Sequence, residues 1–327
     1  MQGLLVLLIA LPLVTALFTI VASGRFAQRI ARISVAGTAT TFLLATVFLW
    51  QALGGHAMQS VVLAQTWGIL TVDPLSALLA FVISGISLIV HIYSVRYMAE
   101  ETGYARFFAM LDLMTATLLL MVCAGDLITL LVAWHLVGVL LYFLLGQDMR
   151  SRSAHRYALW TFLTYRFGDL PLVLAAVLLF SAYDTWSLSE IFSRITADPI
   201  GHEFLGLPLP ELVAALIALA AFARSAPFLL HTWLPYTMGG PTPVSALMHA
   251  GIVNAGGFLI NRFAPVFVHA GDVLHWLFIV GLVTSLVGSV LMLAQNDVKK
   301  ALGYSTMGQM GFMIMECGVG AFSLAIY

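Results

Sequence analysis

The stretch RSAPFLLHTWLPYTMGGPTPVSALMH occupies residues 224–249 and lies among the most apolar segments of the chain. It contains one arginine, two histidines, four prolines and a Gly-Gly pair. A charge in hydrocarbon costs about 2.5–3.5 kcal/mol on the least severe scale, and proline frees backbone groups that lipid cannot satisfy. Such groups persist at membrane depth where protein buries them or where they line a wet cavity. The stretch therefore predicts a transport site built on broken helices.

Composition places the chain in a membrane. Of its 327 residues, 61% are hydrophobic and only 9% are charged, against about 25% charged in soluble domains. A net charge of −1 gives no indication of a nucleic-acid partner. Cys123 and Cys317 lie in apolar runs without C-x-x-C spacing, which favours packing over metal ligation. Neither a G-x-G-x-x-G nor a Walker pattern occurs, so we expect neither nicotinamide oxidation nor ATP hydrolysis in this chain.

Apolar runs of about 20 residues predict an all-α polytopic protein with ten membrane helices. The first run lacks a basic start and is long enough to span, so we interpret it as a membrane helix and not as a signal peptide. Pro227 lies inside the seventh span, and Pro235 is expected to end it. The predicted spans are 3–22, 33–53, 73–95, 107–124, 127–146, 157–180, 211–235, 243–267, 273–294 and 301–327.

Loop charges predict the orientation. Basic residues concentrate after odd-numbered spans, whereas the connection 181–210 is mainly acidic. By the positive-inside rule the odd loops are cytoplasmic and the N-terminus lies outside. We expect 181–210 to cap the outer face, with a short surface helix at 187–195. The basic residues after odd spans are Arg25, Arg29, Arg32, Arg96, Arg106, Arg150, Arg152, Arg156, Lys299 and Lys300.

Charged or protonatable side chains occur at similar depth in four predicted spans, and they predict a shared polar axis. Arg166 and Asp169 are one turn apart on the same helix face, and His135, Arg224 and His249 lie on other spans. Histidine can take a proton at one ring nitrogen while releasing one from the other.

Each of these side chains can instead have a purely structural role. Arg166 and Asp169 can simply form an ion pair, as intramembrane charges usually do. His231 can be structural within the break, and His91 is expected to make a hydrogen bond at a helix end. The remaining intramembrane carboxyl groups, which have no partner evident from the sequence, are Asp112 and Glu316.

Five runs carry a resemblance to a known family. The chain resembles the antiporter-like membrane subunits of respiratory complex I (subunit 5, or L) and of multi-subunit sodium/proton antiporters, from residue 72 onward. These runs are VDPLSALL (72–79), HIYSVRYMAEETGYARFF (91–108), YRFGDL (165–170), HTWLPYTMGGPTPVSALMHA (231–250) and NDVKKALGYSTMGQMGF (296–312).

One variant of this superfamily fits best. The run MHAGIVNAGGFLINRFAPVF (248–267) is similar to the B subunit of DAB-type inorganic-carbon accumulation complexes. That resemblance implies a large zinc-dependent, carbonic-anhydrase-like partner subunit, with ion flow through the membrane subunit driving hydration of CO2 to bicarbonate. It implies a bacterial inner-membrane location, with the zinc in the partner and no cofactor in this chain.

The resemblance also implies roles for single residues. His249 matches the histidine of the family's proton path, and Asp169 matches the aspartate of the family's YRFGDL motif. Arg224 stands where the family has a lysine, and His135, in WHLVG (134–138), stands where it has a glutamate. The family's glutamate tunes the titration of the lysine, whereas arginine does not titrate and two cations repel. This departure argues against an ordinary complex I antiporter subunit.

The resemblance also implies two inverted five-helix repeats, a common plan in transporters. It divides the chain into N-terminal helices (1–106), a first repeat (107–270) and the start of a second repeat (271–327). We expect either that this chain is a fragment or that another polypeptide completes the second repeat.

The sequence thus predicts a proton- or Na+-conducting membrane subunit that is not itself an enzyme. We expect His135, His231 and His249 to relay protons, Arg224 to set the local potential, and Arg166 with Asp169 to shape the path. The alternatives are a subunit of complex I or of a sodium/proton antiporter, and a haem protein with histidine ligands. The helix breaks expected to admit water are Pro227, Pro235, Gly239, Gly240, Pro241 and Pro243.

Overall fold

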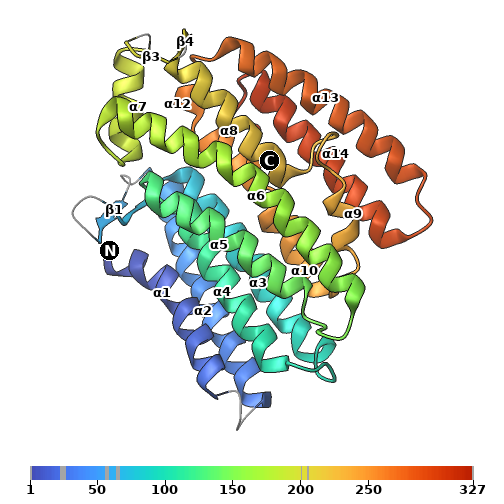
Figure 1. Ribbon diagram of the computed structural model, residues 1–327. Helices are drawn as coiled ribbons and strands as arrows, with labels where there is room; N and C mark the ends of the chain where they lie inside the picture. The colour runs from blue at the N-terminus through green and yellow to red at the C-terminus, as the bar shows by residue number, and fades with distance from the viewer. Residues whose placement is uncertain are drawn as a thin grey trace. The chain divides into compact units, whose positions relative to one another are not determined.

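The computed structural model describes residues 2–22, 27–55, 59–63, 67–199, 201–204 and 206–325. Helices dominate these residues, and the short strands form two small antiparallel hairpins (Figure 1). The chain forms two compact units, one of residues 1–158 with 240–251 and the other of residues 159–239 with 252–327. Arg25, one of the basic loop residues, lies outside the described residues.

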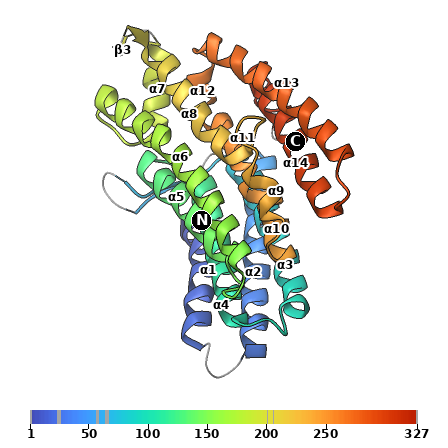
Figure 2. The same ribbon diagram turned by 45° about the vertical axis from the view of Figure 1, so that its right-hand side comes forward.

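The first unit is a bundle of long apolar helices. The helix α2 packs against α3, α1 packs against α4, and α4 packs against α5, an arrangement that Figure 2 also shows. The short helix α10 joins this unit by packing against α3, although it lies far along the chain. Its elements are α1 (Gln2–Ala22), α2 (Ala27–Leu53), β1 (Gln59–Val62), β2 (Ile69–Val72), α3 (Pro74–Tyr97), α4 (Tyr104–Val122), α5 (Leu127–Leu145), the first turns of α6 (Arg152–Tyr183) and α10 (Thr242–Leu247).

Aspartate caps fix the starts of two of these helices. Asp73 accepts a hydrogen bond from the Ser76 amide at 2.8 Å, and Pro74 fills the first position of α3, where a missing N–H costs nothing. Asp126 caps α5 through the Thr129 amide, at 2.8 Å. These local signals explain why the predicted starts of both helices agree with the structure to within one residue.

The second unit contains the broken segment. The helix α8 packs against α11, α12 and α13, and α13 packs along α14. Small residues allow close approach: a Cβ at Gly288 would lie 2.7 Å from the Gly308 amide nitrogen, and one at Gly168 would overlap Ala223. Its elements are the rest of α6, α7 (Leu188–Ala197), β3 (Glu203–Phe204), β4 (Leu207–Pro208), α8 (Leu209–Ser225), α9 (Trp233–Thr237), the end of the π-helix η1 (Met248–Ile252), α11 (Ala255–Arg262), α12 (Ala264–Phe267), α13 (Gly271–Leu293) and α14 (Val298–Gly318).

Eight segments in the described part of the chain are long and apolar enough to cross a membrane, which confirms the polytopic all-α class but not the count of ten. The spans predicted at 211–235 and 301–327 are not among the eight. The predicted end of the first at Pro235 is wrong, because α8 stops at Ser225 and Pro235 lies inside α9. The surface helix expected at 187–195 is confirmed as α7.

Candidate functional site

The helix α8 ends inside the apolar sequence at Ser225, and its last turn carries Arg224. The next residue, Ala226, adopts a left-handed conformation with φ of 50°, which costs a non-glycine residue about 1–2 kcal/mol. The residue after it, Pro227, disfavours continuation of the helix because its ring restricts the residue before it. The break is therefore built into the sequence, and its strain is stored next to a buried charge.

Side chains of this unit satisfy the groups that the break exposes. The Ser225 hydroxyl donates to the Val253 carbonyl at 2.9 Å, and the Phe228 amide donates to the Thr284 hydroxyl at 3.1 Å. In lipid, freed backbone groups need such partners, because no water is available to them. The broken segment is thus a defined structure held by Val253, in the turn after η1, and by Thr284 of α13.

Arg224 lies against a carboxylate and an aromatic ring, and its side chain is fully buried. Its Nη2 atom is 3.7 Å from Asp169 Oδ1, and Arg166 Nη2 is 2.9 Å from Asp169 Oδ2. The Arg224 guanidinium also lies 4.6 Å from the centre of the Tyr165 ring, within the range of a cation–π contact. Trp233 packs edge-on against that ring at 5.0 Å. The structure thus brings Arg166, Asp169 and Arg224 together.

Two polar atoms beside this charge cluster have no hydrogen-bond partner among the described residues. They are Tyr165 Oη and Trp233 Nε1, on side chains that are both 0% exposed. Buried polar groups nearly always have partners, and ordered water is the usual one where protein supplies none. The surroundings of Arg224 are therefore chemically suited to hold water.

His231 lies in the same unit, in the turn between α8 and α9. Its Nδ1 atom contacts the Phe228 carbonyl oxygen, and because a carbonyl can only accept, Nδ1 carries a proton. The half-buried ring stacks near Phe228 and lies 6.4 Å from the Tyr304 ring of α14. The Nε2 atom is the ring position at which a proton can be exchanged.

His135 and His249 belong to the other compact unit. His135 is exposed on α5, and His249 is half-buried in the π-helical turn η1, which directly follows α10. Single π-helical turns are rare and frequently occur at functional sites. The shared polar axis that joins these histidines to Arg224 stays a prediction.

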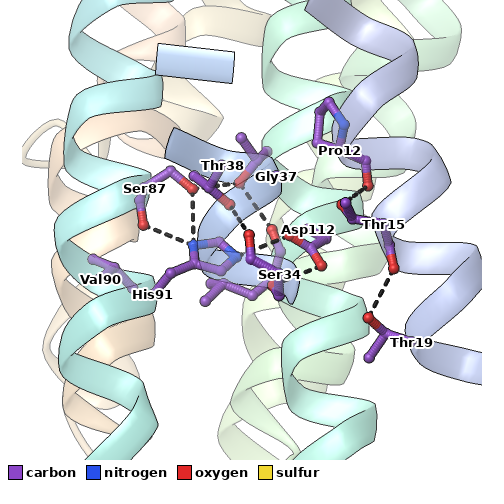
Figure 3. A network of polar contacts seen from close by, with 12 residues as sticks. Pro12, Thr15, Thr19, Ser34, Gly37, Thr38, Ser87, Val90, His91 and Asp112 are labelled. Atoms are coloured by element: carbon purple, nitrogen blue, oxygen red, sulfur yellow. Dashed lines mark hydrogen bonds and ion pairs between the residues drawn. The ribbon is translucent and has the colours of Figure 1, made fainter. Parts of the chain in front are cut away.

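The sequence reasoning missed one buried pair altogether. His91 is not a helix-end hydrogen bonder: it lies six residues before the end of α3, fully buried, with Nε2 3.1 Å from Asp112 Oδ1 (Figure 3). Asp112, for which the sequence suggested no partner, lies on α4. The sequence did show one polar residue in each of two neighbouring apolar spans, which could have indicated the pair. Spacing along the chain, however, does not reveal contacts between helices.

The described residues offer no metal centre. No group of three or more His, Cys, Asp or Glu side chains in that part of the chain is placed to hold a metal ion. Cys123 and Cys317 are both buried and free, consistent with packing.

Buried charges beside a broken membrane helix are typical of ion pathways in membrane proteins. The family described as the NADH:quinone oxidoreductase/Mrp antiporter transmembrane domain matches residues 124–327, and the complex I chain 5 N-terminal family matches residues 63–108. The chain belongs to this antiporter-like family.

Individual relatives agree with that membership. The chain is 63% identical over 318 residues to the "Probable inorganic carbon transporter subunit DabB1" of Halothiobacillus neapolitanus, covering 97% of this chain and 57% of that protein. It is 34% identical to the NAD(P)H-quinone oxidoreductase chain 5 of Synechocystis, covering 87% of this chain and 43% of that protein. The chain thus spans 57% of the length of the first of these relatives and 43% of the second.

Solved structures share the fold. The Mrp complex from Dietzia contains a chain that matches with a TM-score of 0.84 and 29% identity, covering 98% of this chain and 36% of that chain. An archaeal membrane-bound sulfane sulfur reductase matches with a TM-score of 0.87 at 19% identity, which concerns the fold alone, and covers 100% of this chain and 68% of that chain.

Proposed function

We propose that this chain conducts protons, or Na+, as the membrane subunit that energises an inorganic-carbon accumulation complex. The 63% identity to a probable inorganic carbon transporter subunit over 97% of the chain is the observation that carries the proposal. A large zinc-binding, carbonic-anhydrase-like partner would hydrate CO2, and its zinc would belong to that partner. The assembly would lie in a bacterial inner membrane, with the N-terminus of this chain outside.

The charge cluster of Arg166, Asp169 and Arg224 supports ion conduction. Intramembrane charges are expensive and mark ion pathways more often than anchors. Arg224 cannot act as a proton carrier, because a guanidinium keeps its protons. It would instead fix a positive potential at the end of α8 and hold water or anionic groups there, while Asp169, between two guanidinium groups, would gate the path.

Histidines would supply the proton-carrying groups. The His231 ring donates through Nδ1 to the Phe228 carbonyl, which leaves Nε2 for exchange. His135, on α5, and His249, on its π-helical turn, would also carry protons. Water would enter at the non-helical positions around Pro227, Gly239 and Gly240 and at the proline-led start of α10.

A second function has support of its own. A subunit of a quinone oxidoreductase or of an Mrp-type antiporter would also use this fold, as the 29% identity and TM-score of 0.84 to a chain of an Mrp complex indicate. His135 and Arg224, which replace a glutamate and a lysine, favour the inorganic-carbon assignment. Partners identified by mass in the purified complex would separate the two functions: a large zinc protein in one case, quinone-reductase or antiporter subunits in the other.

The test is genetic and uses the whole operon that encodes the complex. A strain that needs high CO2 should grow in air when the complex is supplied, and Asp169→Asn should abolish that growth without loss of the complex from the membrane. Asp272→Asn, at an exposed position in the first turn of α13, is the matched control and should leave growth unchanged. Growth in air with Asp169→Asn would overturn the assigned role of the charge cluster.

A further inference from the structure

His91 and Asp112 form a buried polar centre in the first unit, on helices that do not carry the charge cluster. His91 lies on α3 and Asp112 on α4, both 0% exposed, and Ser34 of α2 reaches the same centre. Figure 3 shows the imidazole between the carboxylate of Asp112 and the turn of α3 that contains Ser87. The three helices thus converge on one acid–base pair.

The contacts of this pair fix two of its hydrogens. The His91 Nδ1 atom is 2.7 Å from the Ser87 carbonyl oxygen, and because this oxygen can only accept, Nδ1 carries a hydrogen. The Ser34 hydroxyl donates to Asp112 Oδ2 at 2.8 Å. The remaining contact joins His91 Nε2 to Asp112 Oδ1 at 3.1 Å.

One proton must lie in that last contact, because two lone pairs facing each other would repel. It can sit on nitrogen, giving imidazolium and carboxylate, or on oxygen, giving neutral imidazole and carboxylic acid. Moving it breaks the Oδ1–H bond and forms the Nε2–H bond, with the electron pair left on oxygen. Both arrangements have zero net charge, as a buried pair requires.

Hydroxyl groups surround the pair. The Ser87 and Thr115 hydroxyl oxygens are 2.5 Å apart, and Thr115 donates onward to the Leu111 carbonyl. Among described residues, no ion pair joins His91 or Asp112 to any other charged group. The other titratable or charged side chains on the helices that pack around the pair are Arg29, Arg32, Tyr93, Arg96, Tyr97, Tyr104, Arg106, His135 and Tyr142, with none on α1 or α10.

Asp126 shows how a purely structural buried aspartate is held in this chain. It accepts from the Ile69 amide, the Thr129 amide and the Thr129 hydroxyl, at 2.7, 2.8 and 2.7 Å. Three donors satisfy an ionised carboxylate without any added proton. Among the described residues, Asp112 has only the Ser34 hydroxyl and the shared contact with His91, so it has fewer donors than Asp126, as suits a carboxyl group that shares a proton.

We propose that His91 and Asp112 form a binding site for one exchangeable proton. Release of the proton would leave a buried carboxylate whose one donor among the described residues is the Ser34 hydroxyl, so the site hands a proton on as another arrives. That the site takes part in transport rests on the function proposed above; that it binds an exchangeable proton does not.

Asp112→Asn tests the site with little disturbance of the packing. The amide oxygen can accept from Ser34 and the amide nitrogen can donate to the neutral Nε2 of His91, so both contacts survive with hydrogens that do not transfer. In the complex with 15N-labelled histidine, His91→Gln assigns the signal. Nε2 of the wild type should show a shared proton, and Nε2 of Asp112→Asn should be unprotonated; identical Nε2 signals in the two proteins would overturn the proposal.

Two further variants keep the test decisive if Asp112→Asn does not assemble. Ser34→Ala removes the donor that stabilises the carboxylate form, so the proton should shift toward Asp112 and the Nε2 signal toward the unprotonated value. Asp126→Asn breaks a helix cap and should lower stability while leaving the His91 signal unchanged. An unchanged His91 signal in Ser34→Ala, or an altered one in Asp126→Asn, would contradict the site.

Proton flux into proteoliposomes tests the role in transport. With the complex intact, Asp112→Asn should reduce flux about 100-fold, the scale of a lost proton-transferring side chain. Wild-type flux in this variant would overturn the role in transport. Absence of flux in the wild-type complex would instead count against the function proposed above, while the 15N result would stand on its own.

Discussion

Arg224 is the residue at which charge and geometry can be separated most sharply. Arg224→Met removes a fully buried cation that lies 3.7 Å from Asp169 and 4.6 Å from the Tyr165 ring centre. Breaking a buried pair costs about 3–5 kcal/mol, and the nearby Arg166, 2.9 Å from the same carboxylate, places the loss near the lower end. Arg224→Lys keeps the charge and loses the planar contacts, at about 1–2 kcal/mol.

The free-energy cost of each substitution predicts a fold-change in proton flux. If they act on the conducting state, about 1.4 kcal/mol corresponds to tenfold, so Arg224→Lys should reduce proton flux about tenfold and Arg224→Met about 100-fold. Flux is measured with a pH-sensitive dye inside proteoliposomes, with complex content checked by size-exclusion chromatography.

Arg194 provides the matched control for this series. It lies in the last turn of α7 and donates from Nη1 to the Tyr183 carbonyl at 2.6 Å. Arg194→Lys and Arg194→Met should therefore leave flux within about twofold of the wild type, as expected for positions outside functional sites. Equal losses for Arg224→Lys and Arg224→Met would contradict this prediction, because guanidinium geometry and not positive charge would then be the requirement.

Three further expectations concern the broken segment and its support. His249→Ala should abolish air growth of a strain that needs high CO2, and wild-type growth would contradict the relay role. Gly168→Leu should prevent stable assembly, because even a Cβ at Gly168 overlaps Ala223, whereas Gly3→Ala should be tolerated because its Cβ meets nothing within 4 Å; equal membrane levels of the two variants would contradict this packing. Ser225→Ala removes a buried hydrogen bond worth about 1 kcal/mol, so thermal unfolding should occur at a lower temperature while flux persists; unchanged unfolding would show that the bond does not stabilise the break.

Helix positions could largely be predicted from the sequence, because length, hydrophobicity and capping are local properties. The starts of α3 and α5 follow Asp73 and Asp126, which cap them. The early end of α8 was harder to predict from the sequence. Its cause is the left-handed Ala226 before Pro227, and the helix breaks there because Thr284 and Val253 elsewhere in the chain supply the needed hydrogen bonds.

The candidate site was predicted in part. Arg166 and Asp169 are three residues apart on one helix, so their pairing could be expected from helical geometry alone. The approach of Arg224 to Asp169, and the Tyr165 ring beneath it, depend on how α6 and α8 pack. The His91–Asp112 pair depends on α3 and α4 in the same way, and no spacing along the sequence encodes such a contact between helices.

If ion flow through this chain drives inorganic-carbon accumulation, the dependence can be measured in membrane vesicles that contain the intact complex. With an imposed proton or sodium gradient, bicarbonate should accumulate in wild-type vesicles, and accumulation should cease when the gradient is collapsed or when Asp169→Asn is introduced. Bicarbonate accumulation that continues at the same rate after collapse of both gradients would show that ion flow through this chain does not drive it.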